Sequence, residues 1–390
     1  MAPGQREESR RAGVLTKQRS GYRAFIPADL PPLDLALSSN LLRRLSVADR
    51  ALARLDGAVM TLPNPDLFIY MYVRREAVLS SQIEGTQASM IDVLAYEAER
   101  DKSQQEIPVA DVMIYIGALK HGLQRLDSLP VSLRLVKEIH GHLMKGVRGG
   151  EPHKTPGEFR TTQNWWGGSS PTNARFVPPP PEEMVRALDS WEKYVHRRDE
   201  LPDLIHIGLV HAQFETIHPF VDGNGRMGRL LISLLLAERK ILEKPLLYLS
   251  IFFKEHKEVY YDRLQAIRDR GEWEEWLEFF VDGVAEVATE ATETAKKILA
   301  LRERDRERIS AMGRRSGNAH RLLDWLFRQP IITVKTVERV LKISQPAANA
   351  LIGSMHRTKI LTETTGYRRN RRFSYDGYLE LFAEASRRGP

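Results

Sequence analysis

Twelve consecutive residues carry the side chains that chemistry on a phosphate group requires. The stretch from His218 to Arg229 reads His-Pro-Phe-Val-Asp-Gly-Asn-Gly-Arg-Met-Gly-Arg, and it lies between two apolar segments. Gly223 and Gly225 let the backbone adopt a positive φ and approach a ligand closely. Free N–H groups at a helix start favour anions, and Arg226 and Arg229, three residues apart, can both bind phosphate oxygens from the first helical turn. The sequence therefore predicts a phosphate-binding site.

Asp222 and His218 add two further functions to this site. A carboxylate beside a phosphate site is explained if Mg²⁺ lies between them, since that ion binds one or two carboxylates together with phosphate oxygens. His218 has an ordinary pKa of about 6.5 and can accept a proton near neutral pH. Asn224 tolerates the left-handed region and supplies an amide. A base, a metal ligand and a phosphate site together indicate phosphoryl or nucleotidyl transfer.

Two other interpretations of the same residues stay open. A histidine before a proline and a Gly-Asn-Gly sequence both occur in ordinary structural turns. A metal hydrolase could use His206, His211, His218 and Asp222, although their spacing matches no standard ligand pattern.

The flanking segments must position this stretch, and both show helical periodicity. Apolar or small residues recur before it at Leu204, Ile205, Gly208, Leu209 and Ala212, and after it at Met227, Leu230, Leu231, Leu234 and Leu235. The stretch is therefore predicted to be a loop that joins two helices. Ile232 and Leu236 widen the apolar surface of the second helix, as expected of a helix surrounded by others.

The stretch also resembles the signature of the Fic family, His-x-Phe-x-(Asp/Glu)-Gly-Asn-Gly-Arg-x-x-Arg, at every fixed position. The resemblance implies a helical core that transfers AMP from ATP to a Ser, Thr or Tyr hydroxyl of a protein. It implies that His218 deprotonates that hydroxyl, that Asp222 holds Mg²⁺ and that Arg229 reaches the γ-phosphate. Binding of the nucleotide is implied for the remaining motif residues Gly223, Asn224, Gly225, Arg226 and Gly228.

A second informative stretch ends the helix predicted at 67–84. Gly85 is a plausible residue to follow a helix C-terminus, where the helix dipole disfavours the carboxylate of Glu84 by up to about 1 kcal/mol. Such a carboxylate needs a cationic partner, and Ser80 lies one turn back on the same face. Ser80 to Gly85 also resembles the inhibitory pattern of the Fic family, (Ser/Thr)-x-x-x-Glu-(Gly/Asn). The resemblance implies that Glu84 pairs with Arg229 and restrains the enzyme.

Residues 157–180 interrupt the helical pattern and are predicted to form a β-hairpin flap. Flaps of this kind can bind a substrate backbone by strand addition. The resemblance implies that this flap positions the target hydroxyl and closes one side of the nucleotide pocket, with Asn173, Ala174, Arg175 and Phe176 at the nucleotide. It also makes Tyr260 a candidate residue of the adenine pocket, with ordinary packing as the alternative.

Composition limits the compartment and the chemistry. The 390-residue chain has a formal net charge of +7 and no cysteine, which excludes disulfides, thiolate metal sites and a cysteine nucleophile. No apolar run approaches the roughly 20 residues of a membrane span, and the N-terminus lacks the apolar core of a signal peptide. We therefore expect a cytoplasmic protein without membrane contact.

The expected fold class is mainly α, with a helical bundle, a flap and a C-terminal winged helix-turn-helix. Three parts are predicted: an N-terminal tail and cover segment (1–64), a catalytic domain (65–308, with the inhibitory helix at 67–85) and a winged-helix domain (309–390). Residues 1 to about 20 are expected to be a mobile tail, 246–270 one helix, and 311–318 a linker. In the last domain, three helices precede a hairpin rich in arginine, including Arg368 and Arg369, an order typical of winged helices.

The function expected first is an ATP- and Mg²⁺-dependent protein adenylyltransferase that modifies a target protein or itself. Removal of AMP, or transfer of another nucleotide or phosphate at the same site, is an alternative that the motif does not separate. A nucleotide-sensing DNA-binding regulator is an alternative of another class. DNA, through the winged helix, and a second copy of the chain are further partners left open.

Overall fold

The computed structural model describes residues 11–60, 62, 65–98, 107–145, 155–198, 201–244, 246–367 and 370–384. Helices dominate these residues, and the predicted fold class is confirmed in this respect. None of the helices in this part of the chain is long and apolar enough to cross a membrane. Two sets of predicted residues lie outside what the structure describes. They are the side chain of Asp66, expected to cap the helix predicted at 67–84, and the residues Arg368 and Arg369.

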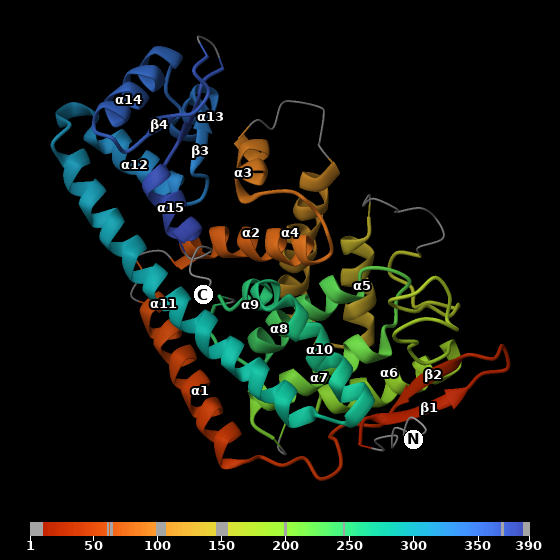
Figure 1. The fold of residues 1–390 in the computed structure, drawn as a ribbon. Helices are drawn as coiled ribbons and strands as arrows, with labels where there is room; N and C mark the ends of the chain where they lie inside the picture. Colours follow the sequence, from red (N-terminus) through yellow and green to blue (C-terminus); the bar gives the residue numbers. More distant parts are fainter. Residues whose placement is uncertain are drawn as a thin grey trace.

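Two buried helices form the centre of the molecule (Figure 1). They are α7 (Asp203–Ile217), in which every residue from Leu204 onward is buried, and α8 (Asn224–Glu238). The prediction of a helix surrounded by others is therefore confirmed. The helices around them are α2 (Pro65–Ile83), α4 (Ile107–Arg125), α5 (Leu133–Leu143), α6 (Pro181–Val195), α9 (Ser250–Glu255) and α10 (Lys257–Arg270). Farther out, α3 (Met90–Ala98) packs against α2 and α4.

One long helix connects the two ends of the molecule. It is α11 (Trp273–Ser310), and α1 (Ser39–Met60) lies along it (Figure 1). Trp276 on α11 donates from Nε1 to the Gly208 carbonyl of α7 at 2.9 Å. This contact fixes the long helix to the centre of the fold.

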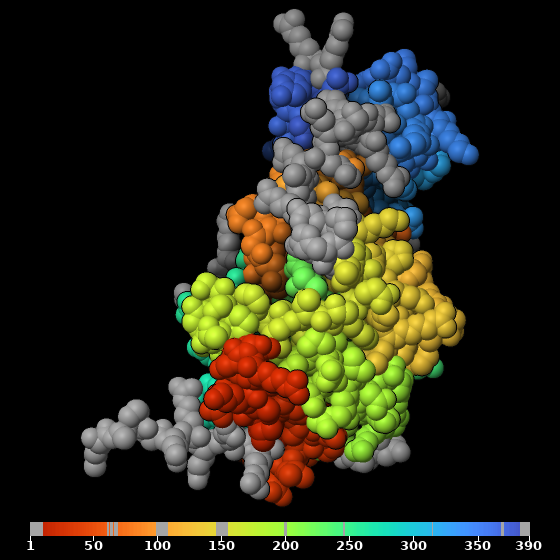
Figure 2. All heavy atoms as spheres, turned by 90° about the vertical axis from the view of Figure 1, so that its right-hand side faces the viewer, coloured from red at the N-terminus to blue at the C-terminus, as the bar shows by residue number. Residues whose placement is uncertain are grey.

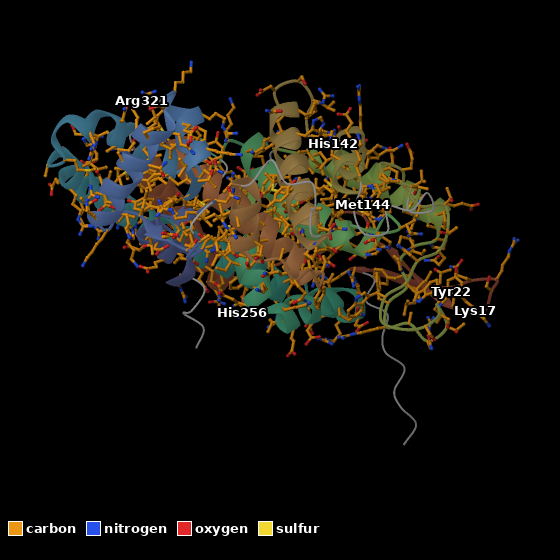
Figure 3. All side chains as sticks on the ribbon, turned by 90° about the horizontal axis from the view of Figure 1, so that it is seen from above. Lys17, Tyr22, His142, Met144, His256 and Arg321 are labelled. Carbon is orange, nitrogen blue, oxygen red and sulfur yellow. The ribbon has the colours of Figure 1, made fainter. Side chains whose placement is uncertain are left out.

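The N-terminal segment differs from the expected mobile tail. Strand β1 (Gly13–Lys17) pairs antiparallel with β2 (Arg23–Pro27), and Figure 2 shows this pair packed against the segment that precedes α6. The Phe25 N–H donates to the Val177 carbonyl at 2.9 Å, and Tyr22 (labelled in Figure 3) contacts Gln163. Most of the β1 side chains are exposed. The strand therefore shows no alternation of apolar and polar residues from which its pairing could have been predicted.

The predicted β-hairpin flap is present in a minimal form. Among the described residues of 155–180, strand pairing is limited to one antiparallel bridge between Trp166 and Phe176. Consecutive prolines follow at 178–181, and they have no N–H to continue a ladder. The segment is held instead by buried Arg160, whose Nε donates to the His218 carbonyl at 3.0 Å and whose Nη2 donates to the Pro179 carbonyl.

The helix expected over 246–270 is divided into α9 and α10. His256 separates them, with φ −109° and ψ 37°. Residues 246–249 precede the first helix, which begins at Ser250, whose N–H and hydroxyl both donate to the Glu76 carboxylate. That contact between distant segments cannot be inferred from local periodicity.

The C-terminal unit contains helices and one small sheet. Its elements are α12 (Ser316–Leu326), β3 (Ile331–Thr333), α13 (Val334–Leu341), α14 (Gln345–Arg357), β4 (Thr362–Glu363), β5 (Arg372–Ser374) and α15 (Asp376–Glu384), with sheet order β3-β5-β4. The linker expected at 311–318 is wrong, because α12 already begins within it after a short 3₁₀ turn at Gly313–Arg315. The winged-helix assignment and DNA binding stay predictions.

Aromatic and polar contacts attach this unit to the rest of the fold. The rings of Phe382 on α15 and Tyr72 on α2 lie 5.5 Å apart. Tyr375 donates to the buried Asp305 carboxylate of α11 at 2.7 Å. The helix that ends near Glu84 is therefore in direct contact with the C-terminal unit.

Candidate active site

The loop between α7 and α8 is fixed by two left-handed residues and one asparagine. His218 ends α7 with φ 50° and ψ 61°, and Gly223 precedes α8 with φ 81°, a region that glycine adopts without steric cost. The Asn224 side chain accepts from the Phe220 N–H at 2.9 Å and donates to the Phe220 carbonyl at 2.8 Å. The loop is thus rigid before any ligand binds.

His218 is held by groups from the segment that precedes α6. The Asn164 amide nitrogen lies 2.9 Å from His218 Nδ1 and donates to the Phe220 carbonyl at the same distance. Burial, with the nearby Arg160 and Arg268 charges, lowers the pKa of His218 to about 3. The imidazole is therefore neutral at physiological pH, the form that can accept a proton.

His140 on α5 supports the same loop from its other side. One ring nitrogen accepts from the Gly157 N–H at 2.9 Å, and the other lies 3.0 Å from the Asp222 carbonyl, to which it donates. The ring stacks on Phe220, with centroids 3.6 Å apart. The neighbouring His142 is exposed and lies against His121, so the two α5 histidines do not share a helix face.

Arg229 is buried and points toward the end of α2. Its Nε donates to Ser80 Oγ at 2.9 Å, and its Nη2 donates to the Ser80 carbonyl at 2.9 Å and to Glu84 Oε1 at 2.7 Å. Burial alone lowers the pKa of Arg229, but the surrounding charges, with Glu84 foremost, raise it above its ordinary value. A Cβ on Gly225 would lie 2.4 Å from Glu84 Oε1, so only glycine admits this carboxylate at the start of α8.

Asp222 and Arg226 lie on the other side of the α8 N-terminus. The Asp222 carboxylate accepts from the Gly223 N–H at 2.6 Å and lies 3.9 Å from Arg226 Nη2. No cluster of three or more metal-ligating side chains occurs among the described residues. A single carboxylate at an anion-binding helix start fits Mg²⁺ that takes its other ligands from phosphate oxygens and water.

One pocket brings together six of the candidate residues: Glu84, Phe176, His218, Gly225, Arg229 and Tyr260. Twelve residues line this pocket: Glu84, Trp166, Phe176, Glu215, His218, Gly225, Arg229, Tyr260, Tyr261, Leu264, Gln265 and Arg268. The Tyr260 hydroxyl lies 2.9 Å from His211 Nε2, so this residue both packs in the core and faces the pocket. The pocket joins a polar end at the α8 N-terminus to an aromatic end at α10.

The other predicted residues lie outside that lining. Asn173 accepts from the Ser170 N–H within the turn, and Ala174 adjoins it. Arg175 pairs with Asp262 at 2.9 Å and lies over the Trp166 ring. Gly228 faces α7, where a Cβ would lie 2.2 Å from Glu215 Oε1.

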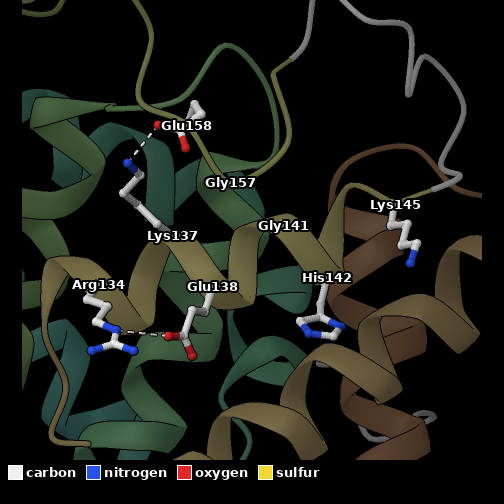
Figure 4. A pocket seen from close by; sticks show the side chains of 8 residues that line it. All are labelled: Arg134, Lys137, Glu138, Gly141, His142, Lys145, Gly157 and Glu158. Atoms are coloured by element: carbon white, nitrogen blue, oxygen red, sulfur yellow. Dashed lines mark hydrogen bonds and ion pairs between the residues drawn. The ribbon is translucent and has the colours of Figure 1, made fainter.

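A second hollow lies on the exposed face of α5 (Figure 4). Its volume is about 590 Å³. Lys137 pairs with Glu158 at 2.6 Å, and Arg134 pairs with Glu138 at 3.1 Å. These pairs reduce its net charge, and it contains none of the candidate catalytic residues.

Sequence reasoning missed four residues at the site: Asn164, Arg160, His140 and Glu215. The first three contact the loop from segments more than 50 residues away in the chain. No local pattern marks them. Glu215 could have been found, because it stands three residues before His218 on the same helix face.

Comparisons with known proteins agree with this geometry. Residues 42–124 match the model described as Fic/DOC family N-terminal, and residues 130–236 match the Fic/DOC family model. The "Probable protein adenylyltransferase" of Aquifex aeolicus is 28% identical over 179 residues, 45% of this chain and 51% of that protein. The "Protein adenylyltransferase Fic" of Culex quinquefasciatus is 29% identical over 184 residues, 47% of this chain and 32% of that protein.

The fold has a similar solved structure. A Fic family protein from Desulfovibrio desulfuricans superposes with a TM-score of 0.57 at 17% identity, over 87% of this chain and 97% of that one. The chain spans about half or less of the length of the named relatives above, so their similarity is confined to one region. The two family matches, the loop geometry and the similar fold agree, and residues 42–124 and 130–236 of this chain belong to the Fic/DOC family.

Proposed function

We propose that the protein transfers AMP from ATP to a Ser, Thr or Tyr hydroxyl of a target protein or of itself. The observation that carries the proposal is the joint placement of His218, the glycine-rich start of α8 and Arg229 around one pocket. The named relatives support the same reaction class.

The proposed reaction is a displacement at the α-phosphorus. The hydroxyl oxygen forms a bond to this phosphorus, the bond to the bridging oxygen of the β-phosphate breaks, and pyrophosphate leaves with the electron pair. His218 takes the hydroxyl proton. The backbone N–H groups from Gly223 to Gly225 and the Arg226 guanidinium stabilise the charge on the phosphates.

Mg²⁺ bound at Asp222 would neutralise phosphate charge during this step. Asp222 itself is oriented by its hydrogen bond from the Gly223 N–H. The Asn164 and Arg160 side chains hold the loop that carries the base. We regard these two as positioning residues for His218.

We further propose that Glu84 restrains the reaction. Its carboxylate occupies the guanidinium that would otherwise bind the γ-phosphate. The pocket has a volume of about 90 Å³, well below the roughly 300–1,000 Å³ of ligand pockets, so side chains around it have to move to admit a whole nucleotide. In the proposal, Glu84 is the one that has to leave Arg229 for the γ-phosphate.

The test is incubation of the purified protein with Mg²⁺ and ATP labelled at the α-phosphate, alone and with candidate target proteins. We expect covalent label that disappears in His218→Ala, while calorimetric binding of ADP is preserved in that variant. ATP labelled at the γ-phosphate is the control, and it should transfer no label. Label from the γ-phosphate form alone would refute AMP transfer and indicate phosphate transfer.

Removal of AMP is tested with an AMP-modified protein in place of ATP. Release of AMP by the wild-type protein, with no forward labelling in any Glu84 variant, would favour the reverse reaction over our proposal.

A further inference from the structure

Glu215 is a buried carboxyl group that lines the nucleotide pocket without a role in the reaction above. The residue is 8% exposed, and it lies on the last turn of α7, three residues before His218. Its Oε1 atom is buried and has no hydrogen-bond partner among the described residues. A buried polar atom without a partner is costly, by about 1–3 kcal/mol, so its presence in a ligand pocket indicates a group that a ligand satisfies.

The position of Glu215 in the pocket determines which part of a bound nucleotide its carboxyl group can contact. Gly225, Arg229 and the α8 N-terminus form the polar end, which suits phosphates. Trp166 and Tyr261 stack with centroids 5.8 Å apart at the aromatic end, and flat apolar walls suit a base. Glu215 lines the same pocket and lies against Gly228 of α8 and near Tyr260 and Tyr261 of α10. It therefore lies between the two ends, where we expect the nucleoside when the phosphates occupy the start of α8.

The surroundings of Glu215 favour its neutral form. Burial raises the pKa of this carboxyl group to about 7. The charged and titratable groups around it come from every packed element: Glu84 after α2, His211 on α7, Arg229 on α8, and Tyr260, Tyr261 and Arg268 on α10. A neutral carboxyl group offers one O–H donor and one acceptor side by side.

We propose that Glu215, as a neutral carboxyl group, hydrogen-bonds the nucleoside of the donor nucleotide and sets the preference of the site for it. The inference rests on the proposed function and extends it from the phosphates to the nucleoside. The partner is a donor–acceptor pair on the nucleoside, either an edge of the base or a ribose hydroxyl.

The test compares Glu215→Gln with Glu215→Met by calorimetric titration with ADP. The amide of glutamine carries a donor and an acceptor at every pH, whereas methionine has similar size and no hydrogen bond to offer. ADP lacks a γ-phosphate, so its binding does not depend on the release of Arg229 by Glu84. Thermal unfolding of each variant shows whether it folds.

We expect Glu215→Gln to bind ADP like the wild type at pH 6, and Glu215→Met to bind at least about tenfold more weakly. Above pH 7 the wild-type carboxyl group ionises and loses its donor. The ratio of wild-type Kd to Glu215→Gln Kd should then rise by up to about tenfold per pH unit. A flat ratio, or a folded Glu215→Met that binds ADP as tightly as the wild type, would overturn the inference.

Two ligands identify the partner. Inosine diphosphate lacks the amino group of adenine. If Glu215→Gln and Glu215→Met bind it with the same Kd, the contact is to the base. If the two variants bind 2′,3′-dideoxy-ADP with the same Kd, the contact is to a ribose hydroxyl. A wild-type protein that binds no ADP overturns the proposed function and this inference together, whereas normal ADP binding by Glu215→Met overturns the inference alone.

Discussion

Replacing Glu84 by glycine should release the proposed restraint on Arg229. In the structure Glu84 Oε1 accepts a 2.7 Å hydrogen bond from Arg229 Nη2. Ser80 contacts the same guanidinium through its hydroxyl and its carbonyl. The substitution removes the carboxylate and leaves the Ser80 contacts in place, so Arg229 should remain ordered and become available to a γ-phosphate.

The size of the effect follows from the exposure of the two partners. A hydrogen bond between charged groups contributes about 1.5–3 kcal/mol. The Arg229 side chain is 1% exposed, but that of Glu84 is 38% exposed, so solvent screens the pair and the lower part of the range applies. About 1.5–2 kcal/mol corresponds to a roughly 10–30-fold gain in ATP affinity.

The assay combines calorimetric titration with label transfer from ATP labelled at the α-phosphate. Glu84→Gly should bind ATP more tightly by this factor and transfer label faster at low ATP, whereas its affinity for ADP should change far less. Glu84→Gln is the matched control, because it keeps a hydrogen-bonding oxygen and loses the charge, and it should fall between the other two proteins. Equal gains for ATP and ADP would refute the reasoning, since the carboxylate would then act by blocking the pocket and not by occupying Arg229.

Three further predictions concern stability. Gly228→Ala should lower the free energy of unfolding by about 1–3 kcal/mol in a urea titration, because its Cβ would lie 2.2 Å from Glu215 Oε1. Gly57→Ala on α1 is the control and should not lower this free energy, because its Cβ would enter open space. Glu76→Gln should lower it by about 1–3 kcal/mol, since an amide nitrogen would replace a buried oxygen that accepts from Ser250, and an unchanged urea midpoint would contradict this. Burial lowers the pKa of four histidines to about 3 or 4: His140, His206, His211 and His218. Their unfolded pKa is about 6.5, so below pH 6.5 the unfolded state binds more protons and stability should fall as the pH is lowered toward 4; a free energy of unfolding that is constant from pH 7 to pH 5 would exclude this.

The central helices and the loop between them were predictable because their signals are local. Helical periodicity on both sides of 218–229 located α7 and α8, and the glycines marked the start of the second helix. The contact between Ser80 and Arg229 spans 149 residues. Its two halves were visible in sequence only as separate motifs, and the resemblance to a family joined them.

The errors have a common physical cause. The segment held by Arg160 and the start of α9 at Ser250 depend on contacts between residues far apart in the chain, and the β1–β2 pair, a local hairpin, is attached to the fold by the Phe25–Val177 hydrogen bond. Such contacts leave no periodicity in the local sequence. Asn164 is the clearest case, because its position beside His218 follows only from how the segment before α6 crosses the loop.

The structure also explains how a restraint can act without disordering the site. On α2, Tyr72, Glu76 and Ser80 are spaced by four residues and therefore share one face. Tyr72 contacts Phe382, Glu76 binds Ser250, and Ser80 contacts Arg229, while Glu84 follows the last turn. Because buried contacts fix the helix, the proposed restraint requires only its partly exposed final carboxylate to leave Arg229, and the guanidinium stays where Ser80 holds it.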